Sequence, residues 1–462
     1  MIRIFRHYIS SAFLWLLILE AFVFYFSMYL GSQLRFLYEA SWYSESDIIA
    51  ASLVFVVVVT LCNISLGLYR RNLGTHDYDL LARVSFSFGI SIAAVVSIYY
   101  IFPEFLIARS VLGAAVIIAF LGMMIIRYFF YRYAKIERIK KQVLVVGSGK
   151  KAVELVTLND SYIHKTFNIT GFLALPDEQV LVDKSLLINS DTSLCETCQK
   201  LNIDEIVLAI DDRRRSMPIS TLLDCKMSGL DIIDLVTFYE REQGLISLNN
   251  VYPSWFLFSD GFAVSGFRSL TKRVFDIVMS VVLLAVSWPF MLMTIIAIKL
   301  EDGIQAPFFY KQVRVGENNQ HFKVIKFRSM VVNAEKNGAQ WAKLRDNRIT
   351  RVGAFIRKVR IDELPQIFNV LTGDMSFVGP RPERPEFVDG FIERIDYYAE
   401  RHRVKPGITG WAQICYPYGA SEEDTVRKLE YDLYYVKNYS MFLDMSIILH
   451  TIEIVLWGKG AR

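Results

Sequence analysis

The chain has 462 residues, of which 53% are hydrophobic and 21% are charged, and its formal net charge is +4. Such an apolar composition is unusual for a water-soluble protein and indicates membrane segments. The small net charge gives no indication of a nucleic-acid partner, and the length is sufficient for two to four domains.

Four apolar runs open the chain, near residues 11–30, 48–68, 84–102 and 107–130, and each is about as long as a bilayer-spanning helix. Basic residues precede the first run, separate the second from the third and follow the fourth, whereas acidic residues occupy the other two connections. The positive-inside rule therefore predicts a four-helix transmembrane bundle over residues 1–140 with both ends in the cytoplasm. The first run is too long for a removable signal peptide and lacks a small-residue cleavage site.

Residues 141–265 alternate between strand-like and helix-like segments, which is typical of a Rossmann-like α/β domain with a parallel sheet. Cys195 and Cys198 form an isolated Cys-x-x-Cys without a second Cys or His pair, which predicts a structural role rather than zinc or redox chemistry. The predicted strands cover residues 142–146, 169–173, 205–210 and 230–235.

The turn after the first of these strands, Gly147-x-Gly149-x-x-Ala152, matches the dinucleotide fingerprint, although no clear acidic residue ends a second strand about twenty residues later. Lys150 and Lys151 would favour an anion at the start of the following helix. Two interpretations stay open: a nucleotide or other ligand site, and a scaffold or dimerisation module.

A third segment, 270–462, begins with a long apolar stretch at 272–299 that contains Ser287 and Pro289. Proline cannot donate a helical hydrogen bond and its ring bends a helix, so we expect a break at these residues. A straight crossing would carry a domain rich in Lys and Arg to the outer side of the membrane. The charges therefore favour a re-entrant helix that enters and leaves by the cytoplasmic leaflet, with a fifth crossing as the alternative.

The adjacent acids Asp362 and Glu363 are the main candidates for chemistry, because two neighbouring carboxylates repel each other unless a cation compensates them. Basic residues surround them and a Gly-Pro-Arg-Pro turn follows, which indicates a metal-assisted site for a phosphorylated substrate. The alternative is an acidic helix start on a solvated surface. The candidate residues for binding substrate phosphates are Arg314, Lys326, Arg328, Arg360, Arg381 and Arg384.

Asp362 is expected at or just before a helix start, with Pro365 in the first turn and Gly373 as the stop. The free backbone N–H groups there should keep Asp362 ionised, and an ionised aspartate can be a covalent nucleophile toward phosphorus. Glu363 would hold a divalent cation, while nearby arginines would neutralise the charge that develops during phosphoryl transfer.

Six motifs after residue 270 carry a resemblance to a known family. They are Lys272-Arg273-Val-Phe-Asp276, Phe327-Arg328-Ser-Met330, Asp362-Glu-Leu-Pro-Gln366, Gly373-Asp-Met-Ser-Phe-Val-Gly-Pro-Arg-Pro382, Arg403-Val-Lys-Pro-Gly-Ile-Thr-Gly-Trp-Ala-Gln413 and Tyr434-Tyr-Val-Lys-Asn438. With them the segment resembles the bacterial sugar transferase family, the monotopic polyprenyl-phosphate phosphoglycosyl transferases. The helical bundle and the Rossmann-like segment resemble its large-architecture branch. The expected fold is thus a membrane protein with a helical bundle, a Rossmann-like domain and an α/β catalytic domain.

The resemblance implies that Asp362 attacks the β-phosphate of a UDP-hexose, releases UMP and holds a phosphosugar that undecaprenyl phosphate then accepts. It implies Mg²⁺ as cofactor with Glu363 as ligand, and Arg381 near the nucleotide or phosphates. It also implies the first step of exopolysaccharide, O-antigen or capsule synthesis, in the bacterial inner membrane with the catalytic domain on the cytoplasmic face. Trp288, between Ser287 and Pro289, departs from the Ser-Pro that many members have.

Three other functions stay open. A membrane-bound nucleotide-sugar dehydratase or epimerase would need a second Gly-x-Gly-x-x-Gly after residue 270, which the sequence lacks. A polysaccharide export scaffold would need a substrate path, for which four helices without intramembrane charge clusters are poorly suited. A direct glycosyl transferase would release UDP instead of UMP.

The sequence leaves the sugar undecided between glucose and galactose. A homodimer through the Rossmann-like domain is a hypothesis. The apolar stretch 441–457 is expected either as an amphipathic support on the bilayer surface or as an ordinary core helix.

Overall fold

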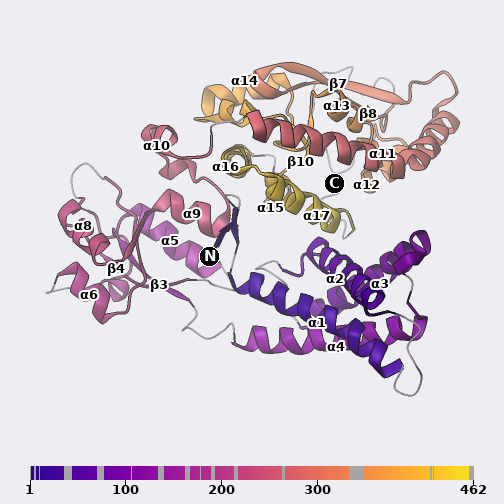
Figure 1. Ribbon diagram of the computed structural model, residues 1–462. Helices are drawn as coiled ribbons and strands as arrows, with labels where there is room; N and C mark the ends of the chain where they lie inside the picture. The colour runs from indigo at the N-terminus through magenta and orange to yellow at the C-terminus, as the bar shows by residue number, and fades with distance from the viewer. Residues whose placement is uncertain are drawn as a thin grey trace. The chain divides into compact units, whose positions relative to one another are not determined.

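The computed structural model describes residues 2–4, 7–9, 11–35, 44–69, 77–105, 107–133, 140–161, 167–176, 178–188, 193–212, 217–262, 266–331, 348–416, 419 and 421–456 (Figure 1). By its contacts the chain divides into two compact units. The first comprises Met1–Arg3 and Tyr8–Glu242, and the second comprises Ile4–His7 and Gln243–Arg462. This division is coarser than the three segments expected from the sequence.

Four long helices follow two short strands, β1 (Ile2–Ile4) and β2 (His7–Ile9). The helices are α1 (Ser11–Arg35), α2 (Glu45–Ser65), α3 (Asp77–Ile101) and α4 (Arg109–Tyr133), with a 3₁₀ turn η1 (Pro103–Phe105) before α4. Each covers one predicted apolar run. Their outward side chains are also apolar, for example Trp15, Phe22 and Ile117. Helices that are apolar on all faces suit a lipid environment, and these four and one later helix are long and apolar enough to cross a membrane.

A buried ion pair joins α1 to α4. Arg127 Nε lies 2.7 Å from Glu20 Oε1, and Arg127 Nη2 donates to Glu20 Oε2 at 3.1 Å, with both side chains 0% exposed. Tyr69 Oη donates to the same carboxylate at 2.5 Å, and Arg127 Nη1 donates to the carbonyl of Leu68 at 2.9 Å. The expectation of a bundle without internal charges is therefore wrong. A paired and hydrogen-bonded charge is tolerated there because its partners replace water.

The Rossmann-like sheet has four parallel strands in the order β4-β3-β5-β6, as the alternation of the sequence predicts. The strands are β3 (Lys141–Val146), β4 (Phe167–Leu173), β5 (Glu205–Leu208) and β6 (Asp231–Asp234). The accompanying helices are α5 (Lys150–Ser161), α6 (Leu194–Lys200), α8 (Ile219–Met227) and α9 (Leu235–Gln243), with a 3₁₀ turn η3 (Lys184–Leu186).

Cys195 and Cys198 both lie on α6. Cys198 is fully buried in the core of the sheet domain, and Cys195 Sγ lies 2.6 Å from Cys225 Sγ on α8 rather than beside Cys198. Within the described residues no group of three His, Cys, Asp or Glu side chains could hold a metal ion. The two cysteines pack helix against helix.

The second unit contains two small sheets, an antiparallel pair β7 (Phe309–Val315) with β8 (His321–Phe327) and a parallel pair β9 (Ser376–Val378) with β10 (Gly407–Thr409). Its helices are α10 (Pro253–Phe258), α11 (Gly266–Asp302), α12 (Arg351–Lys358), α13 (Gln366–Thr372), α14 (Pro385–Arg394), α15 (Trp411–Cys415), α16 (Glu422–Asn438) and α17 (Met441–Leu456). Shorter 3₁₀ segments are η4 (Leu248–Asn250), η5 (Glu317–Asn319), η6 (Ile361–Glu363) and η7 (Tyr398–Arg403).

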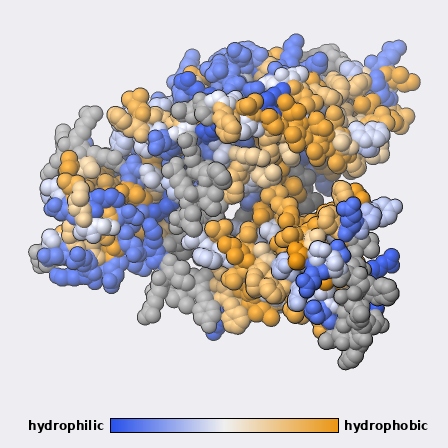
Figure 2. Space-filling view, viewed as in Figure 1, coloured by the Kyte–Doolittle hydropathy of each residue, from blue (hydrophilic) through white to orange (hydrophobic). Residues whose placement is uncertain are grey.

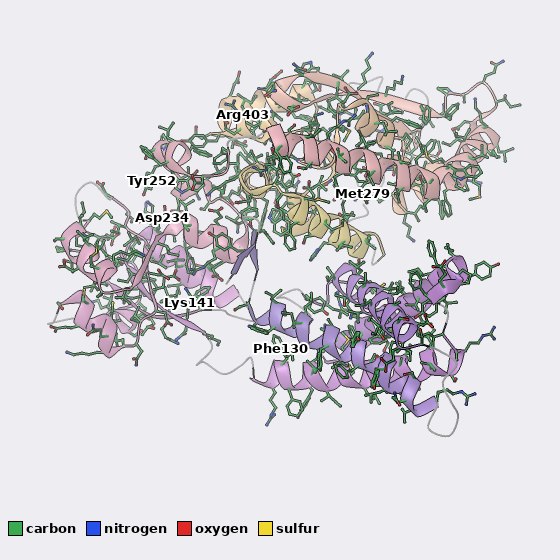
Figure 3. The ribbon with its side chains drawn as sticks, in the orientation of Figure 1. Phe130, Lys141, Asp234, Tyr252, Met279 and Arg403 are labelled. Carbon is green, nitrogen blue, oxygen red and sulfur yellow. The ribbon has the colours of Figure 1, made fainter. Side chains whose placement is uncertain are left out.

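Helix α11 continues without interruption through Ser287 and Pro289, so the expected break is not a loss of helical structure. Pro289 has no N–H to donate to the preceding turn, which leaves a point of bending inside an otherwise helical segment. Many outward side chains of α11 are apolar, among them Val281, Trp288 and Phe290. Apolar atoms gather over this helix in Figure 2, and Figure 3 marks Met279 in its middle.

Both ends of α11 are fixed to the same α/β unit. At the beginning, Lys272 Nζ lies 2.7 Å from Asp444 Oδ2, and Asp276 Oδ1 accepts the backbone N–H of Phe377 at 3.0 Å. At the end, Asp302 Oδ2 lies 2.6 Å from Arg328 Nη2. Both ends of α11 therefore contact the same compact unit.

Helix α17 has two different faces. Leu443 and Ile447 are fully buried, and Asp444 accepts from Tyr435 Oη at 2.7 Å, so this face belongs to the core. Met441 and Ile452 are exposed apolar side chains on the remaining surface. The helix thus combines features of both predicted alternatives.

Candidate active site

The acid pair lies in η6, between α12 and α13. Arg360 immediately before it has φ 60° and ψ 16°, a left-handed conformation just after the end of α12. Helix α13 begins only at Gln366, with Pro365 as its N-cap residue and Gly373 as its C-cap at φ 96°. Asp362 therefore precedes the helix, as one of the two expected placements has it, while Pro365 caps α13 instead of lying in its first turn.

Three cations converge on one oxygen of Glu363. Lys326 Nζ lies 3.1 Å, Arg381 Nη2 3.2 Å and Arg360 Nη1 3.6 Å from Glu363 Oε1. Burial opposes ionisation of this carboxyl, but the positive charges of Lys326, Arg381 and Arg360 hold its pKa well below its usual range. Glu363 is therefore a permanent anion inside a cluster of bases.

Asp362 has a different environment, although it is the next residue. Its side chain is 8% exposed, and within the described residues its Oδ1 has no hydrogen-bond partner. Burial, and then the charge of Glu363, raise the pKa of Asp362 to about 6, while Lys326 and two arginines partly offset the rise. Desolvation therefore outweighs any favourable effect of the backbone dipoles on the pKa at this position. At neutral pH the aspartate is still mainly ionised.

Three of the six predicted basic residues gather at the acid pair: Lys326, Arg360 and Arg381. Arg328 instead forms its ion pair with Asp302 at the end of α11. Arg314 donates to the carbonyl of Pro382 at 3.1 Å and to Gln312, so its guanidinium is directed at a loop backbone. Arg384 is the N-cap residue of α14. The local sequence shows which basic residues lie in a strand or turn, but not which groups they contact in the folded protein.

The carboxylates of the pair can be tested for a magnesium site. Within the described residues, the three cation contacts of Glu363 all use Oε1 and leave Oε2 open, and Asp362 Oδ1 is buried without a partner. Mg²⁺ is usually bound by one or two carboxylates together with substrate phosphates and water. The donor set therefore fits a Mg²⁺ ion that a diphosphate substrate helps to hold.

Several supporting residues could not be assigned from the sequence. Arg273 donates from Nη1 and Nη2 to the carbonyls of Val370 and Leu371, at 2.5 and 2.6 Å, and so satisfies the C-terminal end of α13, the helix that follows the acid pair. Arg401 donates to the carbonyl of Arg381 at 2.9 Å. Arg273 belongs to one of the family motifs. No feature of the charged sequence around Arg401 distinguishes it from its neighbours.

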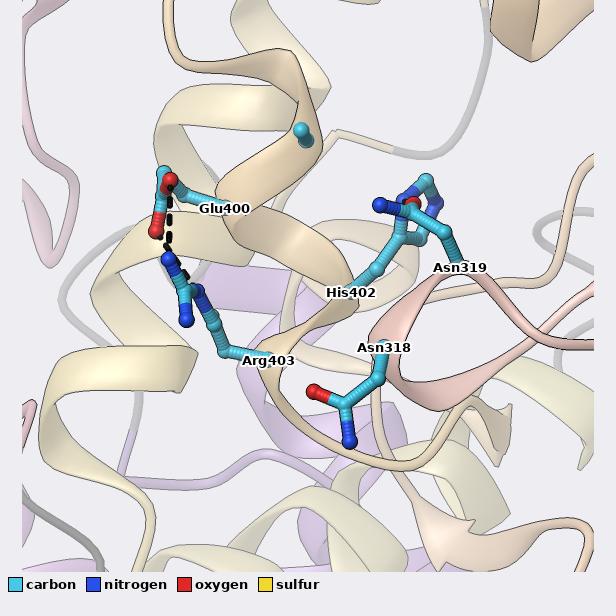
Figure 4. Close-up of a pocket in the computed structure, with 6 residues that line it drawn as sticks. Asn318, Asn319, Glu400, His402 and Arg403 are labelled. Carbon is cyan, nitrogen blue, oxygen red and sulfur yellow. Dashed lines mark hydrogen bonds and ion pairs between the residues drawn. The ribbon is translucent and has the colours of Figure 1, made fainter.

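A hollow of about 250 Å³ lies between η5 and η7, and the acid pair does not line it (Figure 4). Its lining includes His402, whose Nδ1 lies 2.6 Å from Asn319 Oδ1. Burial and the neighbouring Arg401 lower the pKa of His402 to about 3, so the ring is neutral. His402 is therefore a buried structural residue.

The glycine turn of the Rossmann-like sheet is filled by side chains of the chain itself. Asp211 accepts the backbone N–H groups of Lys150 and Lys151 at 2.9 and 3.1 Å, which are the first amides of α5. Glu178 accepts the N–H of Ser148 at 2.7 Å. A Cβ at Gly149 would lie 2.1 Å from Asp211 Oδ2. The anion expected at this helix start is therefore a carboxylate of the protein.

Comparisons with known proteins relate both parts of the chain to known families. A family model described as bacterial sugar transferase matches residues 267–458, and one described as CoA-binding domain matches residues 64–211. The chain is 43% identical over 241 residues to UDP-N-acetylgalactosamine-undecaprenyl-phosphate N-acetylgalactosaminephosphotransferase of Aeromonas hydrophila, covering 52% of this chain and 56% of that protein. It is 33% identical over 349 residues to undecaprenyl-phosphate glucose phosphotransferase of Komagataeibacter xylinus, covering 70% and 61% respectively.

The chain thus spans less than two thirds of the length of these two relatives, 56% and 61%. A third relative, an uncharacterized sugar transferase of Haemophilus influenzae, is 30% identical over 353 residues, which cover 70% of each protein. This match extends over both compact units. From the family model over the second unit and this relative, the chain belongs to the bacterial sugar transferase family.

Proposed function

We propose that the protein transfers a sugar 1-phosphate from a UDP-sugar to undecaprenyl phosphate and releases UMP. The observation that carries this proposal is the pair Asp362–Glu363, in which a buried carboxylate without a described partner lies beside a carboxylate that holds three cations. The names of the first two relatives above give undecaprenyl phosphate as the acceptor, with N-acetylgalactosamine and glucose as the sugars. The sugar donor of this protein is a UDP-hexose or its N-acetyl derivative.

In the first step an oxygen of Asp362 attacks the β-phosphorus of the UDP-sugar. A bond forms between Asp362 and the β-phosphorus, the bond from that phosphorus to the bridging oxygen breaks, and UMP leaves with the bridging oxygen. In the second step a phosphate oxygen of undecaprenyl phosphate attacks the same phosphorus and releases the carboxylate. The product is undecaprenyl-diphosphate-sugar, and no proton is required from the protein in either displacement.

The cations around Glu363 suit this chemistry. Lys326, Arg360 and Arg381 are held at 3.1–3.6 Å from Glu363 Oε1, so they are oriented before a substrate arrives. A diphosphate that enters the site therefore meets positive charges that are already in place. Little free energy is lost in reorienting these side chains. Arg381 and Lys326 would bind the phosphate oxygens on either side of the reacting phosphorus.

Glu363 Oε2 and the substrate phosphates would hold Mg²⁺, with Asp362 close by. When bound, the ion would neutralise charge on the diphosphate and on departing UMP. Glu363 itself keeps its negative charge across the physiological pH range, because the neighbouring cations lower its pKa.

The lipid acceptor requires the site to lie at the membrane surface. Helix α11 has an apolar surface and both of its ends contact the α/β unit, which supports a re-entrant helix rather than a fifth crossing. With both ends of the N-terminal bundle in the cytoplasm, the catalytic unit lies on the cytoplasmic face of the bacterial inner membrane. There the protein starts a lipid-linked repeat unit of an exopolysaccharide, O-antigen or capsule.

The alternatives are less compatible with the site. A dehydratase or epimerase needs a nucleotide cofactor, and the glycine turn that would bind its phosphates is filled by Asp211 and Glu178. An export scaffold has no use for a converging set of acids and bases. The buried Glu20–Arg127 pair shows that the helical bundle does contain internal charges, as a substrate path would need. These two charges, however, neutralise each other.

Product analysis tests the proposal. The full chain in lipid nanodiscs is incubated with undecaprenyl phosphate, Mg²⁺ and, in turn, UDP-glucose, UDP-galactose, UDP-N-acetylglucosamine and UDP-N-acetylgalactosamine. We expect UMP and a lipid-linked sugar with at least one donor. Release of UDP would indicate a direct glycosyl transferase, and absence of lipid product with all four donors would contradict the proposed function.

A further inference from the structure

The loop that carries Arg381 has an unusual hydrogen-bond pattern. Four consecutive carbonyls, those of residues 380–383, each accept a hydrogen bond from outside the loop. Gly407 N–H donates to Pro380 at 3.0 Å, and Val315 N–H donates to Glu383 at 3.0 Å. Arg401 Nη2 donates to Arg381 at 2.9 Å, and Arg314 Nη1 donates to Pro382 at 3.1 Å.

The composition of the loop explains why it needs these donors. Pro380 and Pro382 have no N–H and cannot form a strand ladder or a helical turn at these positions. Pro380 is buried and residues 381–383 are half-buried, so carbonyls there would cost free energy if they lost their donors. The two outer carbonyls are satisfied by backbone amides of β7 and β10, and the two inner carbonyls are satisfied by arginine side chains.

Both arginines are themselves fixed. Arg401 Nη1 donates to Tyr398 Oη at 2.7 Å, and Arg401 Nη2 lies 2.7 Å from Asp432 Oδ2 on α16, with the two side chains 6% and 3% exposed. Arg314 donates from Nη2 to Gln312 Oε1 at 2.7 Å. Each guanidinium is a planar group with several donors, so it can hold a carboxylate or amide and a loop carbonyl together.

Arg381 connects this loop to the acid pair. Arg381 has its carbonyl held by Arg401 and its guanidinium 3.2 Å from Glu363 Oε1. We propose that Arg401 and Arg314 are positioning residues that fix the 380–383 backbone, so that the guanidinium of Arg381 is aimed at the reacting phosphate. This inference rests on the proposed function, and it replaces the predicted phosphate-binding role of Arg314 by an indirect one.

The test compares Arg401→Lys with Arg403→Lys in the full chain in nanodiscs. Arg403 is two residues away on η7, but its side chain is 65% exposed and pairs with Glu400 (Figures 3 and 4). Lysine keeps the charge at 401 but lacks the planar fork that bonds Tyr398, Asp432 and Arg381 together. Since a displacement of about 1 Å at a reacting group can cost about 100-fold in rate, we expect UMP release to fall about 10- to 100-fold for Arg401→Lys and less than about twofold for Arg403→Lys.

A double-mutant cycle separates positioning from general loss of structure. In an Arg381→Ala background, Arg401→Lys should lower the residual rate by less than about threefold, because the group it positions is gone. Arg314→Lys should behave in the same way and covers the case in which Arg401→Lys fails to fold. Equal rates for the 401 and 403 variants, or full additivity with Arg381→Ala, would overturn the inference.

The failure of the proposed function gives a different result. A wild-type protein that releases no UMP from any donor contradicts the reaction itself. In that case a melting experiment tests the positioning role by measuring how much added UMP stabilises each protein. Weaker stabilisation of Arg401→Lys than of Arg403→Lys supports the role, and equal stabilisation contradicts it.

Discussion

Asp362 and Glu363 are neighbours in the chain, yet their surroundings shift their pKa values in opposite directions. Burial raises the pKa of Asp362 to about 6, whereas Lys326, Arg381 and Arg360 outweigh burial and lower the pKa of Glu363. Carboxyl groups whose environments separate their pKa values generally have separate chemical roles. Here the carboxylate without a described partner at Oδ1 is suited to attack, and the paired one is suited to organise charge.

The rate of UMP release should depend on the ionisation of Asp362. With a pKa of about 6 the side chain is ionised at pH 7 and becomes protonated as the pH falls below 6. A protonated aspartic acid is not a nucleophile, so single-turnover UMP release should fall about tenfold for each pH unit below 6. Glu363 does not titrate in this range. A rate that stays constant from pH 7 to pH 5 would contradict this assignment.

The same shift has a consequence for stability. Since the pKa of Asp362 is raised on folding from 3.8 to about 6, its ionised form destabilises the fold above pH 6 and this penalty fades as the pH falls toward 4. Asp362→Asn should therefore abolish activity but raise the free energy of unfolding at pH 7 by about 1–3 kcal/mol. Glu363→Gln is the matched control, because it removes an anion from three cations and should destabilise the fold at the same pH.

Melting of the three proteins in nanodiscs at pH 7 and pH 5 provides the measurement. The gain of Asp362→Asn over the wild type should shrink at pH 5, where the wild-type aspartate is protonated. A variant at 362 that is less stable than the wild type at pH 7 would show that the carboxylate has stabilising partners in the folded protein.

At the scale of single elements, local patterns predict the elements but not their distant contacts. Strand β3 ends in four buried apolar residues, at 143–146, and it begins one residue before the predicted strand 142–146. The cap of the next helix is not predictable in this way, because Asp211 is 61 residues from Lys150. The Glu20–Arg127 pair, separated by 107 residues, was missed for the same reason, and so was Arg401. Sequence periodicity gives the buried face of an element and no information about which distant side chain completes it.

The filled glycine turn leads to a prediction for Asp211. Its carboxylate accepts two amides at the start of α5, so it acts as a cap and interacts with the helix dipole. Asp211→Asn should lower the free energy of unfolding by about 1 kcal/mol, and the exposed Asp224→Asn should have a smaller effect. Melting of the full chain measures both. If added CoA or NADH stabilises the Asp211 variant and the wild type to the same extent, the turn binds phosphate despite its carboxylates and this interpretation is wrong.

At the scale of the whole molecule, the path of α11 determines on which side of the membrane the active site lies. Phe267 near its start and Ile304 just after its end are 78% and 85% exposed. A re-entrant helix places both positions on the cytoplasmic side. In a background without the five native cysteines, cysteines at 267 and 304 should both react with a membrane-impermeant maleimide in inverted vesicles and neither in intact spheroplasts. Opposite accessibility of the two positions would establish a fifth crossing.

The covalent intermediate is the central claim, and intact-protein mass spectrometry tests it most directly. The full chain in nanodiscs is mixed with the donor that supports UMP release, in the presence of Mg²⁺ and without undecaprenyl phosphate. We predict a mass increase equal to one sugar phosphate that maps to Asp362, is absent from Asp362→Asn and disappears when the lipid phosphate is added. An adduct that persists in Asp362→Asn, or rapid lipid-dependent turnover of the wild type without any adduct, would contradict the account.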